Sequence, residues 1–263
     1  SGTRSSLLWE CCKIIEEKKP KYLLMENVKN LVGKNHKNNF LKFLTYLEKL
    51  GYTNSWKILN AKNFGVPQNR ERLFIIAWYN KFVNVDYFKF PYGIAKDGTT
   101  IYEIAKLKDG TLITRVSDIF EPASVTTSFT ITDKMWEGHR LRKERNRQNG
   151  KGFGYSLFYN DSVYSSTISA RYWKDGSEIL IDQSDKNLNP RTLTPVEAGR
   201  LQGYRIIGQG WEYPECANNQ NYNDSSLEFK IVVSKKEAYR QFGNSVAVPV
   251  IKRLAAEIIK QLF

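Results

Sequence analysis

Three polar residues stand at alternate positions just before an apolar run: Gln68, Arg70 and Arg72. In an extended chain, alternate side chains project to one side, so these three would form a row of fixed donors. Glu26 directly follows another apolar run and would stand at the carboxyl edge of a parallel sheet, where such folds bind ligands. Clustered Glu, Gln and Arg are the groups that recognise a nucleobase edge. Each part also has a structural interpretation, as a turn-capping carboxylate or as a surface loop with an Arg–Glu ion pair.

A second polar feature is the turn Gly243-Asn244-Ser245, which immediately precedes the last helical pattern. Gly243 permits a close or left-handed backbone, and the two residues after it present an amide and a hydroxyl at a helix start. Capping alone explains this turn, so ligand binding there needs independent support.

Two basic segments could contact a polyanion. Lys134 to Arg147 carries four arginines and two lysines, which suits phosphate contacts and equally suits a solvated loop or helix. Arg171 to Lys174 interleaves cations with aromatic rings, a pattern more typical of a nucleic-acid surface.

The composition supports a polyanionic partner. Among 263 residues, 40 Lys and Arg against 27 Asp and Glu give a net charge of +13, which favours nucleic acid first and an anionic membrane surface second. No apolar run reaches the roughly 18 residues that cross a bilayer, and no leader opens the chain, so we expect a cytoplasmic protein without membrane association. Three cysteines without Cys-x-x-Cys, and two histidines, support neither a disulfide framework nor a metal site.

Helical and strand patterns alternate up to about residue 80. An amphipathic helix from Leu7 to Ile15 leads into the strand pattern Tyr22 to Met25, and a second helix from Phe40 to Leu50 leads into Ser55 to Leu59. The run Leu73 to Trp78 is apolar on both faces, as in a parallel strand covered by helices on both sides. The alternation predicts a doubly wound α/β domain.

The pattern changes twice further along. Residues 81–190 show short aromatic and β-branched runs without a sustained helical period, and we expect a separate strand-rich module there. Helices return in 191–263, where Thr194, Pro195 and Glu197 form a capping-box pattern and a last helix with Pro249 in its first turn runs to the end. The predicted division is therefore 1–80, 81–190 and 191–263.

These pieces, in this order, resemble the motifs of the DNA cytosine-5 methyltransferases over nearly the whole chain outside the middle module. The matching segments are Gly2 to Leu8 for the fifth motif, Glu26-Asn27-Val28 for the sixth, Gln68-x-Arg70-x-Arg72 for the eighth, Arg191 to Gly203 for the ninth and Gly243 to Val246 for the tenth. The middle module stands where the family carries its target-recognition domain, and Thr167-Ile168 is similar to the Thr-Leu usual there. The resemblance implies the carboxy-terminal part of a Rossmann-like methyltransferase fold.

The resemblance also implies a reaction. Duplex DNA is bound, a cytosine is flipped out, a thiolate adds to ring carbon 6, and carbon 5 takes a methyl group from S-adenosylmethionine. Glu26 would donate a proton or strong hydrogen bond at ring nitrogen 3, Arg72 would hold the oxygen at position 2, and Arg70 would orient Glu26 or the surroundings of the nucleophile. The remaining implied residues are Leu7, Asn244, Ser245 and Val246 for the cofactor, and Asn27, Gln68, Thr167, Arg171 and Gln241 for the DNA.

The first motif and the fourth, which bears the nucleophile in a Pro-Cys pair, do not occur in this sequence. Cys11, Cys12 and Cys216 stand elsewhere relative to the motifs and read as packing or surface residues. The first hypothesis is thus an enzyme portion that works only when a missing amino-terminal half completes it. A non-catalytic DNA-binding or complementing subunit is the second, and an RNA-directed relative stays open as a third.

Overall fold

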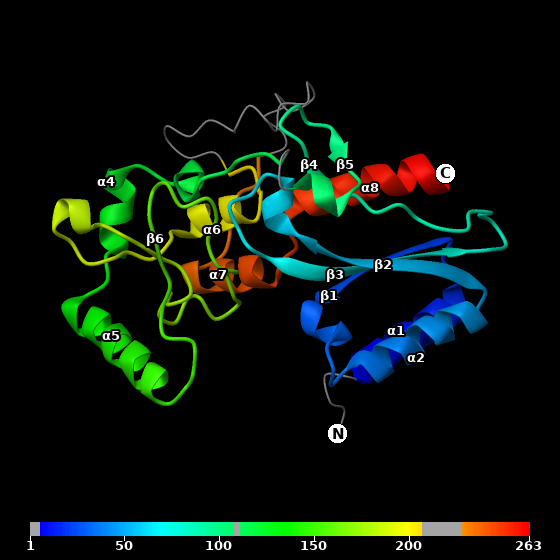
Figure 1. Cartoon of the computed structure of the whole chain (residues 1–263), viewed down its shortest axis with the longest axis horizontal. Coiled ribbons are helices and arrows are strands. Elements are labelled where there is room, and N and C mark those ends of the chain that lie inside the picture. The colour runs from blue at the N-terminus through cyan, green and yellow to red at the C-terminus, as the bar shows by residue number, and fades with distance from the viewer. Residues whose placement is uncertain (1–5, 108–110, 207–227) are drawn as a thin grey trace. The chain divides into compact units, whose positions relative to one another are not determined.

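The computed structural model describes residues 6–107, 111–206 and 228–263. The chain forms two compact units. The first comprises residues 1–59, 71–91 and 253–263, and the second comprises 60–70 and 92–252 (Figure 1).

A three-stranded sheet organises the first unit. Its strands are β1 (Tyr22–Val28), β2 (Tyr52–Asn60) and β3 (Glu71–Tyr79), in the order β1-β3-β2. β1 and β3 are antiparallel, with a register from Tyr22 opposite Trp78 to Val28 opposite Arg72. The prediction that β3 lies in a parallel sheet is therefore wrong for this pair. A run that is apolar on both faces reports coverage of both faces, and it carries no information on strand direction.

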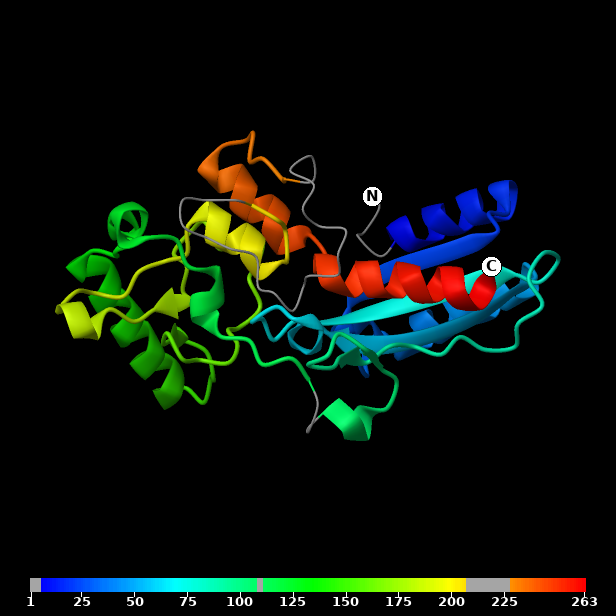
Figure 2. The same ribbon diagram turned by 90° about the horizontal axis from the view of Figure 1, so that it is seen from above.

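Helices cover both faces of this sheet. On one face, α1 (Ser6–Lys18) and α2 (Lys37–Lys49) pack against alternate strand residues, which include Leu23, Met25, Leu73, Ile75 and Ala77. The last turns of α8 (Val248–Leu262) lie across the other face (Figure 2). There the Tyr22 hydroxyl donates to the Leu262 carbonyl at 2.8 Å, and the rings of Tyr22 and Phe263 stack at 4.5 Å. The predicted helices, strands and two-sided cover are confirmed.

The second unit is built from short elements around a core that includes Val116, Ile168, Tyr172, Ile179, Leu201 and Phe242. Its described residues form the α-helices α4 (Ala123–Thr126), α5 (Asp133–Gln148), α6 (Pro195–Leu201) and α7 (Lys235–Asn244), and α8 begins in this unit. Its strands are two residues each: β4 (Gly93–Ile94), β5 (Thr100–Ile101), β6 (Leu157–Phe158) and β7 (Leu180–Ile181). The 3-10 helices within the described ranges are Lys29–Val32, Ala61–Phe64, Ile104–Lys106, Val116–Ile119, Thr127–Phe129 and Ser184–Lys186.

Two predictions about this region have different outcomes. The capping box is confirmed, since Thr194 accepts from the Glu197 amide, and Glu197 accepts from the Thr194 amide while pairing with Arg191 at 2.7 Å. The expectation of a strand-rich middle module without sustained helix is wrong for the described residues, because α5 runs for 16 residues. None of the helices in the described ranges is long and apolar enough to cross a membrane.

Candidate functional site

Glu26 and Arg72 meet at one end of the sheet in the first unit. The Arg72 Nε lies 3.1 Å from the Glu26 Oε1. The Arg72 side chain is 18% exposed and the Glu26 side chain is 27% exposed. The antiparallel register causes this meeting, because Glu26 lies opposite Phe74 and Arg72 opposite Val28, so the two side chains are diagonal neighbours on one face. The predicted parallel arrangement would not have paired the end of β1 with the start of β3.

The contacts of this pair hold its guanidinium in place. Burial lowers the pKa of Arg72, and the Glu26 carboxylate acts against that shift. The guanidinium is also held by a 2.8 Å hydrogen bond from its Nη1 to the carbonyl of Glu71. A carboxyl group beside a fixed guanidinium, both partly open to solvent, can present a proton or hydrogen bond and a positive charge side by side to one planar ligand.

Asn27, which follows Glu26, is exposed and its Oδ1 accepts from the Val28 amide at 2.8 Å. Lys29 follows the last residue of β1 and Glu71 is the first residue of β3. These two residues form an exposed ion pair at 2.9 Å. This end of the β1–β3 pair is therefore polar, while the strand centres are apolar.

Arg70 has a different environment, inside the second unit. It is 2% exposed, and its guanidinium donates to three backbone carbonyls: Ile168 at 3.2 Å, Gly243 at 3.1 Å and Ser245 at 2.6 Å. These carbonyls belong to two segments far apart in the sequence, the Thr167-Ile168 segment and the turn after α7. Arg70 thus fixes both segments to its own loop.

Gln68 is likewise internal. It is fully buried, its Nε2 donates to the Leu201 carbonyl at 2.9 Å, and its Oε1 accepts from the Ile168 amide at 3.1 Å. Thr167 is more open, and its hydroxyl donates to the Asn69 carbonyl at 2.7 Å. The row predicted at positions 68, 70 and 72 is therefore divided: the first two side chains bond to backbone groups of the second unit, and the third bonds within the first.

The turn Gly243-Asn244-Ser245 ends α7 and leads to α8. A Cβ on Gly243 would lie 2.3 Å from the Ala170 amide nitrogen, so only glycine allows this approach of the two segments. The Asn244 side chain is exposed, Val246 is half-buried, and the Ser245 hydroxyl donates to the Phe242 carbonyl at 2.9 Å. The fixed backbone with an open amide fits a ligand-binding turn. Leu7 lies in α1, and Gly2 to Ser5 fall outside the described residues.

An aromatic–cation group accompanies the turn that carries Arg171. The Trp173 ring is 39% exposed and has the Lys236 Nζ at 4.5 Å and the Lys174 Nζ at 5.6 Å from its centroid. Arg171 is exposed, as is Gln241 on α7. The sequence analysis did not identify Lys236, because it stands some sixty positions after Trp173 in a segment with ordinary helix-start residues. Its contact with Trp173 is visible only in the folded chain.

The described cysteines lie on α1. Cys12 is 2% exposed and burial raises the pKa of its thiol, which opposes formation of the thiolate that a nucleophile requires. Cys11 is exposed, and Cys216 lies outside the described residues.

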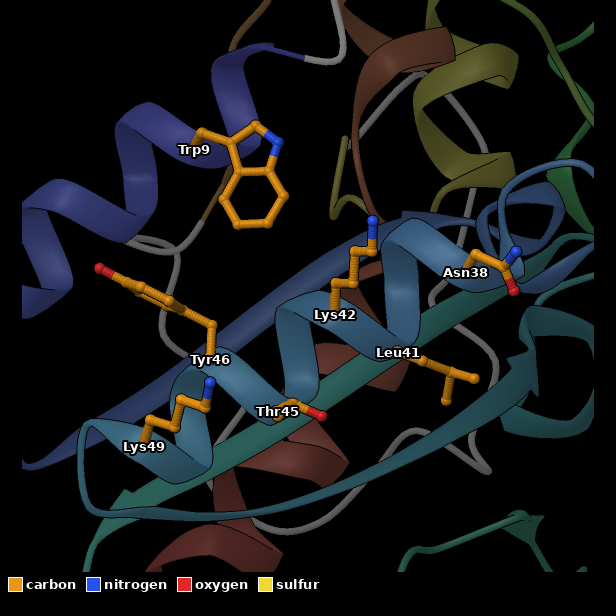
Figure 3. A pocket seen from close by; sticks show the side chains of 7 residues that line it. All are labelled: Trp9, Asn38, Leu41, Lys42, Thr45, Tyr46 and Lys49. Atoms are coloured by element: carbon orange, nitrogen blue, oxygen red, sulfur yellow. The ribbon is translucent and has the colours of Figure 1, made fainter.

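A surface hollow of about 530 Å³ lies between α1 and α2 and is lined by Trp9, Lys42, Tyr46 and Lys49, among others (Figure 3). It contains none of the residues predicted for catalysis, cofactor or DNA. The Glu26–Arg72 pair is therefore the part of the first unit whose geometry matches the predicted chemistry.

Comparison with known proteins supports one family over the whole chain. The family model for C-5 cytosine-specific DNA methylase matches residues 1–205 and 212–260. The type II methyltransferase M.SsoII of Shigella sonnei is 45% identical over 100% of this chain and 59% of the relative. The type II methyltransferase M1.ScrFI of Lactococcus lactis subsp. cremoris is 43% identical over 99% and 57%, so this chain spans less than two thirds of either.

Solved structures agree on the fold. A DNMT2 of Spodoptera frugiperda has a TM-score of 0.62 at 20% identity, with 95% of this chain and 70% of that chain covered. The Dnmt2 methyltransferase of S. pombe has a TM-score of 0.59 at 18% identity, with 92% and 67% covered. At these identities the likeness concerns the architecture alone.

Proposed function

This chain belongs to the C-5 cytosine-specific DNA methylase family, and we propose that it supplies the recognition module and part of the active site of a sequence-specific DNA cytosine-5 methyltransferase. The complete enzyme would transfer a methyl group from S-adenosylmethionine to carbon 5 of a flipped-out cytosine in duplex DNA. Relatives that are type II methyltransferases support a place in restriction-modification.

The observation that carries this proposal is the ion pair between Glu26 and Arg72 at 3.1 Å. Attack at carbon 6 pushes electrons into the ring toward nitrogen 3 and the oxygen at position 2. Glu26 would place a proton or strong hydrogen bond at nitrogen 3, and Arg72 would stabilise the charge on that oxygen. Two groups on one sheet face can meet two adjacent edge atoms of one pyrimidine, and the pairing also holds both in place before the base arrives.

Arg70 would act at one remove from the ring. By holding the carbonyls of Gly243 and Ser245, it fixes the turn of Asn244, Ser245 and Val246, the residues of the second unit that would hold the cofactor. S-adenosylmethionine would bring the methyl group to be transferred. The role of Leu7 in the same pocket rests on the family resemblance.

We further propose that the thiolate comes from outside this sequence, from the amino-terminal half of the enzyme. The lack of a Pro-Cys pair and the burial of Cys12 support this, together with relatives that extend well beyond the region matched here. Duplex DNA and that half would then be the partners of the chain.

A complementation assay tests the proposal. The chain is mixed with a polypeptide that holds the residues of M.SsoII not covered by it, and tritiated methyl transfer to duplex DNA is measured. We expect no transfer by the chain alone, transfer by the mixture, and a loss of about 100-fold or more with Glu26→Gln or Arg72→Ala.

Glu10→Gln is the matched control, because Glu10 is an exposed carboxylate on α1 paired only with Lys13 in the described contacts, and it should leave transfer unchanged. Binding of duplex DNA without any transfer, using several folded amino-terminal halves, would favour the complementing or purely DNA-binding subunit. Full methyl transfer by the Glu26→Gln variant would contradict the role proposed for the Glu26–Arg72 pair.

A further inference from the structure

Helix α5 is held to the second unit by one face. At about 1.5 Å per residue, its 16 residues span roughly 24 Å. Trp136 packs edge-on against Tyr155 at 4.9 Å, His139 is buried, and Lys143 lies over the Tyr155 ring at 4.1 Å. Residues spaced by three and four positions thus turn inward.

Polar anchors make this attachment rigid. Arg142 pairs with Asp175 at 2.8 Å and donates to the Gly154 carbonyl, while Asn146 donates to the Phe153 carbonyl. A Cβ on Gly154 would lie 2.4 Å from the Lys143 Cα, so the loop touches the helix backbone. Asp175 belongs to the turn that also carries Arg171 and Trp173.

The opposite face of α5 points to solvent. It carries Lys134, Gly138, Leu141 and Arg145, which recur at three- and four-residue spacing, and nothing lies within 4 Å of a Cβ built on Gly138. Leu141 is 62% exposed. Leu141 lies near the centre of this otherwise polar face, where its side chain is open to an apolar group of a partner.

The charges of this helix select the partner. Arg140 pairs with Glu137 and Arg147 with Glu144, whereas Lys134 and Arg145 take part in no ion pair among the described residues. The free face therefore presents Lys134 and Arg145 near Leu141, and its flanks carry Arg140 and Arg147, each paired with a glutamate of the same helix. A partner that fits this face is anionic and presents both methyl groups and hydrogen-bonding edges. The major groove of duplex DNA has these groups and is wide enough to admit an α-helix.

We propose that α5 is the element that enters the major groove of the target duplex, with Arg145 and Leu141 contacting base edges and the flanking cations contacting phosphates. This rests on the proposed function and goes further, because it assigns sequence selectivity to named residues. Arg145 would donate to a guanine edge, and Leu141 would contact a thymine methyl group. Figure 1 shows α5 along the margin of its unit, as this role requires.

Selection from a random duplex library tests the inference with the full 263-residue chain. DNA retained by the chain is sequenced, and dissociation constants for the enriched duplex and for an unrelated duplex are measured by fluorescence anisotropy. We expect Arg145→Ala to weaken binding of the enriched duplex by about 5- to 150-fold and to relax one position of the enriched sequence. Leu141→Ala should relax an A·T position.

Lys13→Ala is the matched control, because it removes one exposed cation from a helix of the other unit and should change neither sequence nor affinity by more than about twofold. Circular dichroism should show unchanged helix content and melting in all variants. The inference is overturned when Arg145→Ala and Leu141→Ala retain the wild-type sequence and affinity, when the wild-type chain enriches no sequence, or when the variants change self-association instead. The complementation assay judges the proposed function separately, because methyl transfer can occur whichever element reads the sequence.

Discussion

Replacing Arg70 tests whether its role is structural, in contrast to the catalytic role proposed for Arg72. In the structure its guanidinium donates to three carbonyls at 2.6–3.2 Å. Hydrogen bonds to charged groups contribute about 1.5–3 kcal/mol each, and the desolvation of a buried guanidinium offsets part of the sum. For Arg70→Ala we therefore expect a net loss of about 3–5 kcal/mol in the free energy of unfolding, from a total that is commonly 5–15 kcal/mol.

The assay is urea unfolding followed by circular dichroism, with amide hydrogen exchange read at 168–172 and 243–248. Arg70→Ala should lower the midpoint and raise exchange in both segments, because both lose a common donor. The urea midpoint of Arg70→Lys should lie between those of wild type and Arg70→Ala, because a single ammonium group replaces the planar guanidinium. Arg72→Ala should cost only about 0–1 kcal/mol, because its ion pair is partly exposed, yet it should abolish transfer in the complementation assay. The distinction between the two arginines would be refuted if the urea midpoint of Arg70→Ala equals that of wild type within error. It would also be refuted if Arg70→Ala and Arg72→Ala lower the free energy of unfolding equally.

Three further predictions concern the second unit. Burial first, and then Arg142, lower the pKa of His139, so its neutral form stabilises the fold above its unfolded pKa of about 6.5, and that stability is lost as the pH falls through the folded pKa. His139→Gln should flatten the fall in melting temperature between about pH 7 and 5. Gly243→Ala should destabilise by about 1–3 kcal/mol or more in urea titrations, because its Cβ would meet backbone at 2.3 Å. Glu197→Ala should cost about 3–5 kcal/mol in the same titrations, because it leaves the Arg191 cation buried without its partner.

The elements that the sequence predicted correctly are those whose signals are local. The capping box at Thr194 and Glu197, and the last helix with Pro249 in its first turn, each depend on residues within a turn or two, and each is present in the structure. The strands were equally visible as apolar runs. Their direction was not, because the pairing of β1 with β3 joins residues about fifty positions apart and is decided by packing.

The segment of helix α5 was left open in the sequence as a loop or a helix, for a different physical reason. Its inward face is held by Arg142, Asn146 and His139 rather than by an apolar stripe, so the usual hydrophobic period is missing. The carbonyl partners of Arg70 were equally invisible, since every residue has a backbone carbonyl and no sequence pattern marks the ones that receive a buried guanidinium. The sequence pattern predicted that Arg70 would face a ligand, whereas in the structure its guanidinium donates to backbone carbonyls of the same unit.

The row Gln68, Arg70, Arg72 was interpreted as one set of donors for one ligand, and the structure gives a reason to treat it as two. The boundary between the compact units falls between Arg70 and Glu71. On one side of it Gln68 and Arg70 tie the loop to the Ile168 segment and the Gly243 turn, and on the other Arg72, the second residue of β3, pairs with Glu26. Alternation along an extended chain brings like side chains to one side only while the same unit surrounds them. Where the chain passes from one unit to the other, the same spacing places Gln68 and Arg70 on backbone groups of the second unit and Arg72 on Glu26 of the first. In the proposed function, the first two order the segments proposed for recognition and cofactor binding, and Arg72 contacts the base.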